Sequence, residues 1–314
     1  MGQTIQILNT GLKISLRGLS VVDNKIVWVS GNNGKVGKSA DGGKSWKWIT
    51  VKGFERSDFR SISALNKNIA LIMSVAAPAY ILRTTDGGDS WKTVYENKDT
   101  SMFLDAMEFW NEESGIALGD PIHNRFFIIR SFDGGKTWRE IPGKDCPAAA
   151  TGEACFASSG TNIRKLNKQE AVFVSGGKES NLFIRDKKIA LPILQGTESS
   201  GANSIAVKSS KIMIIVGGDF TKKDSTNKNC VITLDGGNSF STPTTQPHGY
   251  RSCVEFLRKK NWICTGLNGS DYSTDEGRNW KSISSESFNS CRKAKYGKAV
   301  FFAGNNGTIG KLVY

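Results

Sequence analysis

Five copies of one eight-residue turn, spaced at the length of a four-stranded unit, predict an all-β fold: a seven-bladed β-propeller of four-stranded blades. The first copy is SADGGKSW at residues 39–46. Its closing aromatic position, 46, returns at 91, 138, 240 and 280, so the intervals are 45, 47, 102 and 40 residues. The longest interval leaves room for one further unit that has lost the turn. Such periods among short alternating strands are typical of propellers.

Each part of the octet suits a tight turn between two strands. We expect the carboxylate of Asp41 to accept backbone N–H groups, while Gly42 and Gly43 adopt positive φ. The hydroxyl of Ser39 can secure the incoming strand, and Trp46 can fold over the turn as an apolar plug. Calcium binding is the functional alternative, but the alternating carboxylates of a calcium loop are missing. The octets are therefore expected to be structural.

The turns divide the chain into seven units. The first four span residues 16–49, 59–94, 103–141 and about 155–194, and units five and six contain the octets at 233–240 and 273–280. Unit four has lost its octet and carries RDKK at residues 185–188. Unit seven, residues 290–314, supplies only three strands. We expect the strand at residues 4–8 to complete it and close the ring, because closure removes exposed sheet edges.

Composition fits a single domain over residues 1–314. The apolar set is 38% of the chain, and no apolar run approaches a membrane span, so we expect no integral membrane protein. Residues 31–39 resemble a phosphate-binding loop, but Asn32 stands where the first glycine is required. With no dinucleotide, haem or flavin motif present, we expect no cofactor. We also expect a monomer.

Four of the six cysteines fall at apolar strand positions of other units and are expected to fill the core. They are Cys230, Cys253, Cys264 and Cys291. No Cys-x-x-Cys pair exists, and His123 and His248 are the two histidines. We therefore expect no metal site.

Cys146 and Cys155 lie in the long connection between units three and four, with eight residues between them. In an oxidising compartment they could form a disulfide, and the sequence leaves this open. Residues 268–270 and 306–308 read as glycosylation sequons. These features favour a secreted or periplasmic protein, although the chain shows no signal peptide and the cytoplasm stays an alternative.

The positive charge is concentrated in the second half. Residues 1–157 carry 19 Lys+Arg and 17 Asp+Glu, and residues 158–314 carry 23 and 12. Many of these cations fall on turns between first and second strands, on the face of the octets. They are Arg164, Lys165, Lys168, Lys208, Lys211, Arg258, Lys259, Lys260, Arg292 and Lys293. This face suits an acidic partner or an anionic surface, or is simply solvated. Nucleic acid is disfavoured because no aromatic residues interleave with these cations.

The opposite face is predicted to carry the binding site. Aligned starts of the inner strands place Arg17, Arg60, Asp105, Asn162, Asn203, Arg251 and Asn289 around the central funnel. Neighbouring loops add Asp58, Asp120, His123, Glu153, Asp219 and Tyr250. Three arginines converging on an axis would form a clamp for a carboxylate or phosphate. The structural alternative is that these arginines pair with the acids.

The octet resembles the Asp box, or bacterial neuraminidase repeat, and the blade pattern resembles the photosystem II stability and assembly factor-like propellers. Sialidases are distantly similar Asp-box propellers, and they hold a substrate carboxylate with three arginines. They also use a Tyr–Glu nucleophile pair and an Asp acid/base. The sialidase Phe/Tyr-Arg-Ile-Pro signature is absent here, with FRSI at 59–62 and YRSC at 250–253, and seven units replace six. The assembly-factor-like proteins bind partners without a cofactor.

Together these observations predict recognition of an anionic small molecule, a glycan or an acidic protein partner at the funnel mouth. Binding is assigned to Arg17, Arg60, Arg251, Asp58, Asn162, Asn203 and Asn289. The alternative is a sialidase-like hydrolase or lyase acting on an anionic sugar. Its candidate catalytic residues are Asp105, Asp120, His123, Glu153 and Tyr250. Whether the protein is an enzyme is left open.

Overall fold

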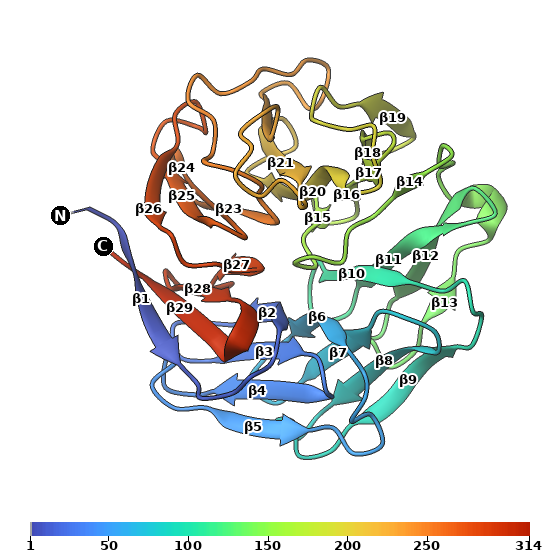
Figure 1. Cartoon of the computed structure of the whole chain (residues 1–314). Helices are drawn as coiled ribbons and strands as arrows, with labels where there is room; N and C mark the ends of the chain where they lie inside the picture. The colour runs from blue at the N-terminus through green and yellow to red at the C-terminus, as the bar shows by residue number, and fades with distance from the viewer. Residues whose placement is uncertain (1) are drawn as a thin grey trace.

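In the computed structural model, which describes residues 2–314, seven antiparallel sheets stand around a central axis (Figure 1). Blade 1 contains β2 (Leu16–Val21), β3 (Val27–Gly31), β4 (Lys35–Ser39) and β5 (Lys47–Thr50). Blade 2 contains β6 (Phe59–Ala64), β7 (Ala70–Ser74), β8 (Ala79–Thr84) and β9 (Lys92–Asn97). Blade 3 contains β10 (Leu104–Phe109), β11 (Gly115–Ile122), β12 (Arg125–Ser131) and β13 (Arg139–Glu140). The first strand of each blade lies nearest the axis.

The remaining blades follow the same order. Blade 4 contains β15 (Ile163–Lys165), β16 (Ala171–Val174), β18 (Asn181–Ile184) and β19 (Lys187–Ala190). Blade 5 contains β20 (Ser200–Val207), β21 (Met213–Asp219) and β22 (Cys230–Thr233), extended by β14 (Glu153–Ala154) and β17 (Gly176–Gly177). Blade 6 contains β23 (Cys253–Arg258), β24 (Asn261–Gly266), β25 (Gly269–Ser273) and β26 (Lys281–Ser284). Two 3₁₀ turns are present, η1 (Gly143–Asp145) and η2 (Asn305–Gly307).

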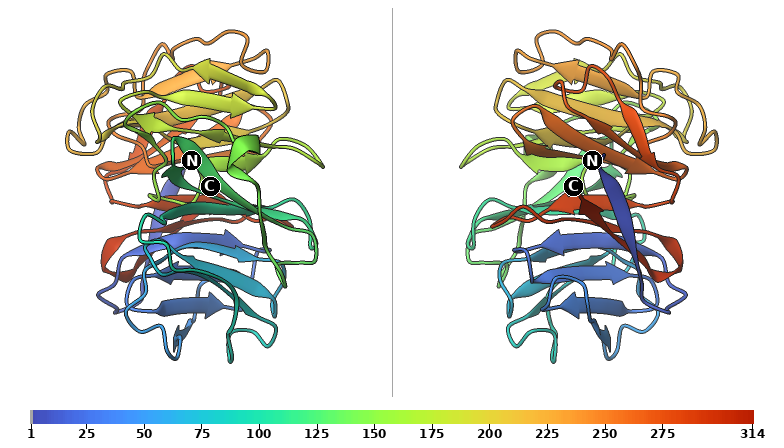
Figure 2. Two further views of the ribbon diagram at one scale, coloured as in Figure 1. Left: turned by 90° about the vertical axis from the view of Figure 1, so that its right-hand side faces the viewer. Right: turned by 90° about the vertical axis from the view of Figure 1, so that its left-hand side faces the viewer.

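The seventh blade joins the two ends of the chain, as predicted. It contains β27 (Ser290–Lys293), β28 (Val300–Ala303) and β29 (Thr308–Val313), and its outer strand is β1 (Thr4–Asn9). β1 pairs antiparallel with β29 from Thr4↔Val313 to Asn9↔Thr308. Figure 2 shows β1 lying along the outside of this blade. The predicted seven-bladed all-β fold is confirmed, with one irregularity: the outer position of blade 5 is a single bridge between Ile232 and Ser241.

The hydrophobic core is divided into clusters that lie between neighbouring blades. Between blades 1 and 2, for example, Trp28 and Phe59 are fully buried. Burial of apolar surface between adjacent sheets is what holds a ring of separate blades together. Cys253 and Cys291 belong to the cluster between blades 6 and 7, as expected of core residues. Cys230 and Cys264 lie between blades 5 and 6.

The octets form the predicted turns, with a division of roles that the sequence does not reveal. Asp41 accepts the Ser45 N–H at 2.9 Å and the Ser45 hydroxyl at 2.6 Å, both in exposed positions. The buried N–H is that of Gly43, which donates to Ser39 Oγ at 2.9 Å. The other four copies repeat these contacts. The hydroxyl therefore satisfies the buried donor, and the carboxylate orders the exposed part of the turn.

Cys146 and Cys155 are separate buried thiols in this structure. The Cys146 thiol donates to the carbonyl of Ile141 at 3.6 Å, and the Cys155 thiol donates to the carbonyl of Val174 at 3.8 Å. Cys155 packs in the core between blades 3 and 4. The disulfide that the sequence left open is therefore not formed here.

Candidate functional site

The inner strands of four blades begin with a β-bulge, and each bulged residue belongs to the predicted site. In blade 1 the pairing of β2 with β3 moves from Leu16↔Gly31 to Gly18↔Ser30, which leaves Arg17 as the extra residue. The bulged residues of blades 1, 2, 3 and 5 are Arg17, Arg60, Asp105 and Asn203. A bulge re-aims the side chain of a strand and is common beside functional sites. It brings these polar groups to the end of the axis where the inner strands begin.

Arg251 does not join this group, because it lies one position earlier in its blade than Arg17 does in blade 1. The backbone N–H of Arg251 donates to Gly217 O of the preceding blade, as the N–H of Leu16 donates to Gly304 O. A difference of one residue turns a side chain to the opposite face of a sheet. Arg251 is 1% exposed, and its Nε donates to Asp271 Oδ2 at 2.6 Å. The expected convergence of three arginines therefore reduces to two, and Arg251 forms a buried ion pair inside blade 6.

Part of the connection between blades 3 and 4, residues 158–161, crosses the axis (Figure 1). Blades on several sides hold it by hydrogen bonds. Arg17 Nη1 donates to Ser158 O at 3.3 Å, and Ser158 Oγ donates to Asn203 Oδ1 at 3.0 Å. Ser159 Oγ donates to Ser252 O at 2.7 Å, and Arg292 Nη2 donates to Gly160 O at 3.1 Å. This segment separates the two ends of the axis. We call the end where the inner strands begin the mouth; it is defined by Arg17, Asp58, Arg60, Asp105, Asp120, Asn203 and Tyr250.

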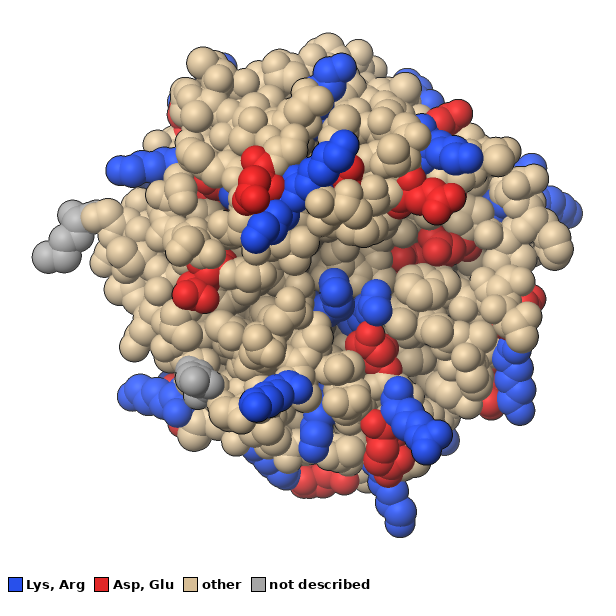
Figure 3. Space-filling model, in the orientation of Figure 1, with Lys and Arg blue, Asp and Glu red and all other residues tan. Residues whose placement is uncertain are grey.

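Two arginines at the mouth lie close together with one carboxylate between them. Arg60 Nε donates to Asp58 Oδ2 at 2.7 Å, and both side chains are about one-third exposed. Arg17 donates to a main-chain carbonyl, and no carboxylate of the described residues lies within 4.0 Å of it. Burial lowers the pKa of Arg17, Arg60 lowers it further, and Asp58 opposes these effects. Figure 3 shows the hollow at the centre of this face, with basic and acidic groups side by side at its rim.

Asp105 and Asp120 form the acidic side of the mouth. Asp105 is fully buried, and within residues 2–314 neither of its oxygens has a hydrogen-bond partner. Burial raises the pKa of Asp105 well above its usual value, Asp120 raises it further, and Arg60 opposes the shift. Burial also raises the pKa of Asp120 to about 6, although its Oδ1 accepts the N–H of Cys155 at 2.8 Å. The raised pKa of Asp105 favours its protonated form, in which the carboxyl can donate a hydrogen bond.

The third side of the mouth is formed by Tyr250 and the aromatic residues behind it. The Tyr250 hydroxyl donates to Asn203 Oδ1 at 2.7 Å and lies 3.3 Å from Ser158 Oγ. Burial raises the pKa of Tyr250 to about 12, against the effects of Ser158 and Arg17. The ring of Phe220, 41% exposed, packs edge-on against Tyr250 and Phe156, with centroids 6.4 and 6.1 Å apart. An exposed aromatic surface therefore adjoins the charged hollow.

Two predicted candidates lie elsewhere. Glu153 is 4% exposed and fully engaged in joining the long connection to blade 4. Its carboxylate accepts hydrogen bonds from Ser175 Oγ, Asn181 Nδ2, Ala150 N and Lys188 Nζ. His123 is exposed in the turn between β11 and β12, with φ 51°. It borders a separate hollow of about 660 Å³ beside Phe126 and Lys144. Neither residue contributes to the mouth.

Three of the predicted polar residues are buried within the fold. Asn289 is buried and donates through Nδ2 to the carbonyl of Leu16 at 2.9 Å, which ties blade 7 to blade 1. Asn162 is fully buried directly before β15, and its amide atoms find no partner among the described residues. Asp219 accepts the N–H and hydroxyl of Thr221, at 2.9 and 2.7 Å.

A second hollow, which the alignment did not predict as a site, occupies the opposite end of the axis. We call it the axial cavity. Its volume is about 420 Å³, and its charged lining residues are Glu108, Glu112, Arg164, Lys165, Glu255, Arg292, Lys293 and Lys295. Four of these, Arg164, Lys165, Arg292 and Lys293, belong to the basic turns read from the sequence. The glutamates were missed because the alignment compared only the strand starts, whereas Glu108 and Glu255 lie inside β10 and β23 and Glu112 follows β10.

The comparisons with known proteins agree with this architecture. The family model of the BNR/Asp-box repeat matches residues 129–140, which contain the third octet with its complete set of turn contacts. The match identifies one Asp-box repeat within this seven-bladed β-propeller. A comparison with curated proteins finds no match.

Among solved structures, this propeller is similar to one described as YCF48 bound to D1 peptide. The identity is 15% and the TM-score 0.68, over 99% of this chain and 95% of that one. YCF48 from Cyanidioschyzon merolae is similar at 15% identity and a TM-score of 0.69, over 98% of each chain. The WD40 propeller domain of Doa1 is similar at 14% identity and a TM-score of 0.67, over 99% and 97%. These likenesses establish the shared fold.

The structure offers no helix suited to crossing a membrane within the part of the chain that it describes.

Proposed function

We propose that this propeller binds a segment of a partner protein at its mouth, with a carboxylate of that segment placed against Arg17 and Arg60. The observation that carries the proposal is the state of Arg17. Its side chain is partly buried, lies near the guanidinium of Arg60, and has no carboxylate within ion-pair distance among the described residues. A partly buried arginine of this kind is stabilised by an anion that accepts its remaining N–H groups.

The acidic side of the mouth complements this role. A protonated Asp105 can donate a hydrogen bond to the bound carboxylate, in the way that a neutral carboxylic acid serves in other anion-binding sites. The raised pKa of Asp105 favours this protonated form, and its oxygens are not engaged by other described residues. Asn203 and Tyr250 supply further polar groups whose positions are fixed by their mutual hydrogen bond.

The preference for a protein segment over a small anion rests on the surface beside the hollow. Phe220 is 41% exposed and continuous with Phe156 and Tyr250. Aromatic side chains next to polar groups favour peptide recognition, because they bury apolar neighbours of the anchoring residue. A YCF48 propeller of similar fold is described as bound to a D1 peptide, which supports a protein partner as the class of ligand.

The sialidase-like alternative finds less support. Its three-arginine clamp would need Arg251, which is paired with Asp271 inside blade 6. Its nucleophile would need a carboxylate beside Tyr250, whose hydroxyl contacts Asn203 and Ser158. The mouth therefore favours binding over hydrolysis.

The test is selection of binders from a library of random twelve-residue peptides displayed against the wild-type protein. Selected peptides are synthesised and titrated by fluorescence anisotropy against the wild type, Arg17→Gln and Arg60→Gln. We expect enrichment of peptides with an acidic residue next to an apolar one. Their affinity should fall at least tenfold, about 1.4 kcal/mol, in either variant.

The matched control is the double variant Lys25→Gln and Lys67→Gln. These exposed lysines lie on the turns after the inner strands of the same blades, on the opposite face, and they carry the same type of charge. Binding should be unchanged in this control. Selected peptides that bind equally to the wild type and both arginine variants would refute the proposal. Binding of acidic sugars or free dicarboxylates in parallel thermal-shift screens, without binding of any peptide, would refute the proposed class of partner.

A further inference from the structure

The axial cavity lies at the octet-face end of the axis, and none of the residues that define the mouth lines it. Arg292 connects the cavity to the crossing segment, because it lines the cavity and donates to Gly160 O at 3.1 Å. The volume of about 420 Å³ falls within the range of small-molecule sites, roughly 300–1,000 Å³. The cavity is therefore separate from the mouth and has the size of a ligand site.

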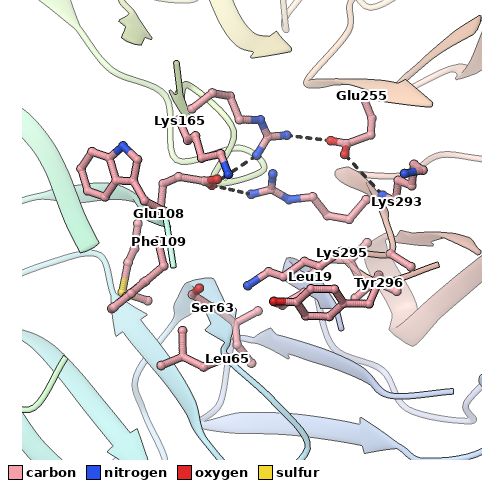
Figure 4. Close-up of a pocket in the computed structure, with 18 of the residues that line it drawn as sticks. Leu19, Ser63, Leu65, Glu108, Phe109, Lys165, Glu255, Lys293, Lys295 and Tyr296 are labelled. Atoms are coloured by element: carbon pink, nitrogen blue, oxygen red, sulfur yellow. Dashed lines mark hydrogen bonds and ion pairs between the residues drawn. The ribbon is translucent and has the colours of Figure 1, made fainter. Parts of the chain in front are cut away.

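The charges that line the cavity are unequal. Five cations, Arg164, Lys165, Arg292, Lys293 and Lys295, face three carboxylates, Glu108, Glu112 and Glu255. Figure 4 shows Glu108 and Glu255 reaching from opposite sides, while Lys295 points into the hollow from blade 7. Glu108 lies within ion-pair distance of both Arg164 and Arg292, and Glu255 pairs with Arg164.

The ion pairs leave much of the positive charge uncompensated. Arg164 Nη2 lies 2.9 Å from Glu255 Oε2, but Nη1 lies 3.7 Å from Glu108 Oε2 and makes no hydrogen bond within residues 2–314. Arg292 Nη2 is 4.0 Å from the same oxygen of Glu108. The ammonium groups of Lys165 and Lys293 have no carboxylate within 4.0 Å in the described part of the chain. Arg164 is only 6% exposed, so water screens this charge weakly.

The remaining wall is apolar and partly aromatic. Leu65, Phe109 and Trp110 line it from blades 2 and 3, and Val207 lines it from blade 5. Tyr296, 69% exposed, stands at the edge and points toward the hollow (Figure 4). Apolar walls with a few converging charged groups are the usual composition of a site for an organic ligand.

We propose that the axial cavity binds a small organic anion, in which a carboxylate or phosphate group is attached to a flat apolar body. The anionic group lies between Arg164, Arg292 and the lysines of blades 4 and 7, and the apolar body lies against Phe109 and Trp110. Its oxygens accept hydrogen bonds from Arg164 Nη1 and from the ammonium groups, while Glu255 continues to hold Nη2. The excess of cations that the octet face carries is then explained by a ligand site at its centre. This site is independent of the proposed function of the mouth.

The experiment is isothermal titration calorimetry of the whole protein with four probes: benzoate, phenyl phosphate, acetate and inorganic phosphate. We expect one of the aromatic anions to bind at a single site. Its affinity should exceed that of the matching non-aromatic anion at least tenfold, and the tighter of the two aromatic probes identifies the preferred anionic group. Equal affinity for aromatic and non-aromatic anions, or no binding of any probe, would overturn the proposal.

Variants locate the binding. Arg292→Gln should weaken the binding of the aromatic anion at least tenfold. Lys165→Gln should weaken this binding severalfold, and because Lys165 is exposed this change does not threaten folding. Lys168→Gln removes the same charge from an exposed position on the neighbouring turn and should leave the affinity unchanged. Arg17→Gln should also have no effect, which separates this site from the mouth. Affinity unchanged by Arg292→Gln and Lys165→Gln, or reduced equally by Lys168→Gln, would contradict the assignment.

Discussion

Asp120→Asn is expected to stabilise the protein above pH 6, because the mouth holds this carboxylate in an unfavourable environment. Burial raises the pKa of Asp120 from 3.8 to about 6. Between these two values the folded protein keeps a proton that the unfolded chain releases. The stability contributed by this group therefore falls as the pH rises through that window. Asparagine removes the ionisation and keeps an oxygen to accept the N–H of Cys155.

The magnitude is set by the pKa difference. About 2.2 pH units, at ~1.36 kcal/mol per unit, gives an upper limit of about 3 kcal/mol at pH 8. For a chain of this length that corresponds to a rise in Tm of about 4 °C. The gain should shrink through pH 6 and vanish near pH 4, where the wild-type carboxyl is protonated in both states.

The assay is urea unfolding of the wild type and Asp120→Asn at pH 4, 6 and 8, monitored by tryptophan fluorescence. Thermal melting in the same buffers provides a second measure. Equal stability of the two proteins at pH 8 would refute the reasoning. So would a gain of the same size at pH 4, since that would arise from packing and not from ionisation.

Three further predictions concern the fold. Ser131→Ala should destabilise the protein by about 1 to 3 kcal/mol, because the buried N–H of Gly135 loses its acceptor. Asp133→Ala should cost less, because the partners of its carboxylate are exposed. Urea unfolding measures both changes, and the reverse order would contradict the division of roles in the octet. Removal of residues 1–9 should lower the Tm and promote self-association, because β29 becomes an open sheet edge. Thermal melting and size-exclusion chromatography measure these effects, and a monomer with unchanged Tm would be inconsistent with ring closure by β1. Arg251→Ala should destabilise the protein by about 3 to 5 kcal/mol, because the buried Asp271 loses its guanidinium partner, although it keeps the contacts of His248. A stable variant in chemical unfolding would argue against a structural role.

The sequence predicted the fold well because the repeat is carried by local chemistry. The glycines and the Asp of each octet specify the turn wherever it occurs, and β1 was recognised because it remained as the only unassigned strand beside an incomplete blade. The irregular outer edge of blade 5 was not predictable from the octet at 233–240, which is intact. Pairing of an outer strand depends on the residues beyond the turn, and the segment after Phe240 forms only one bridge.

The site was predicted in part, and the failures share a physical cause. Alignment placed Arg251 with Arg17 and Arg60, but Arg251 occupies the position of Leu16, one residue earlier, since both backbone N–H groups donate to the preceding blade. Nothing in the residue types marks where a strand gains an extra residue. The crossing segment at residues 158–161 was equally hidden, since its small polar residues have no repeat counterpart. Glu108 and Glu255 could have been found as charged residues on inner strands that are otherwise apolar.

The central claim is that Arg17 binds a carboxylate of a partner segment at the mouth. A double-mutant cycle measures it most directly: a selected acidic peptide and its Glu→Gln or Asp→Asn counterpart are titrated against the wild type and Arg17→Gln. A direct contact predicts a coupling energy of at least about 1 kcal/mol, with the neutral peptide insensitive to Arg17→Gln. Additive losses, with no coupling between the peptide carboxylate and Arg17, would contradict the claim.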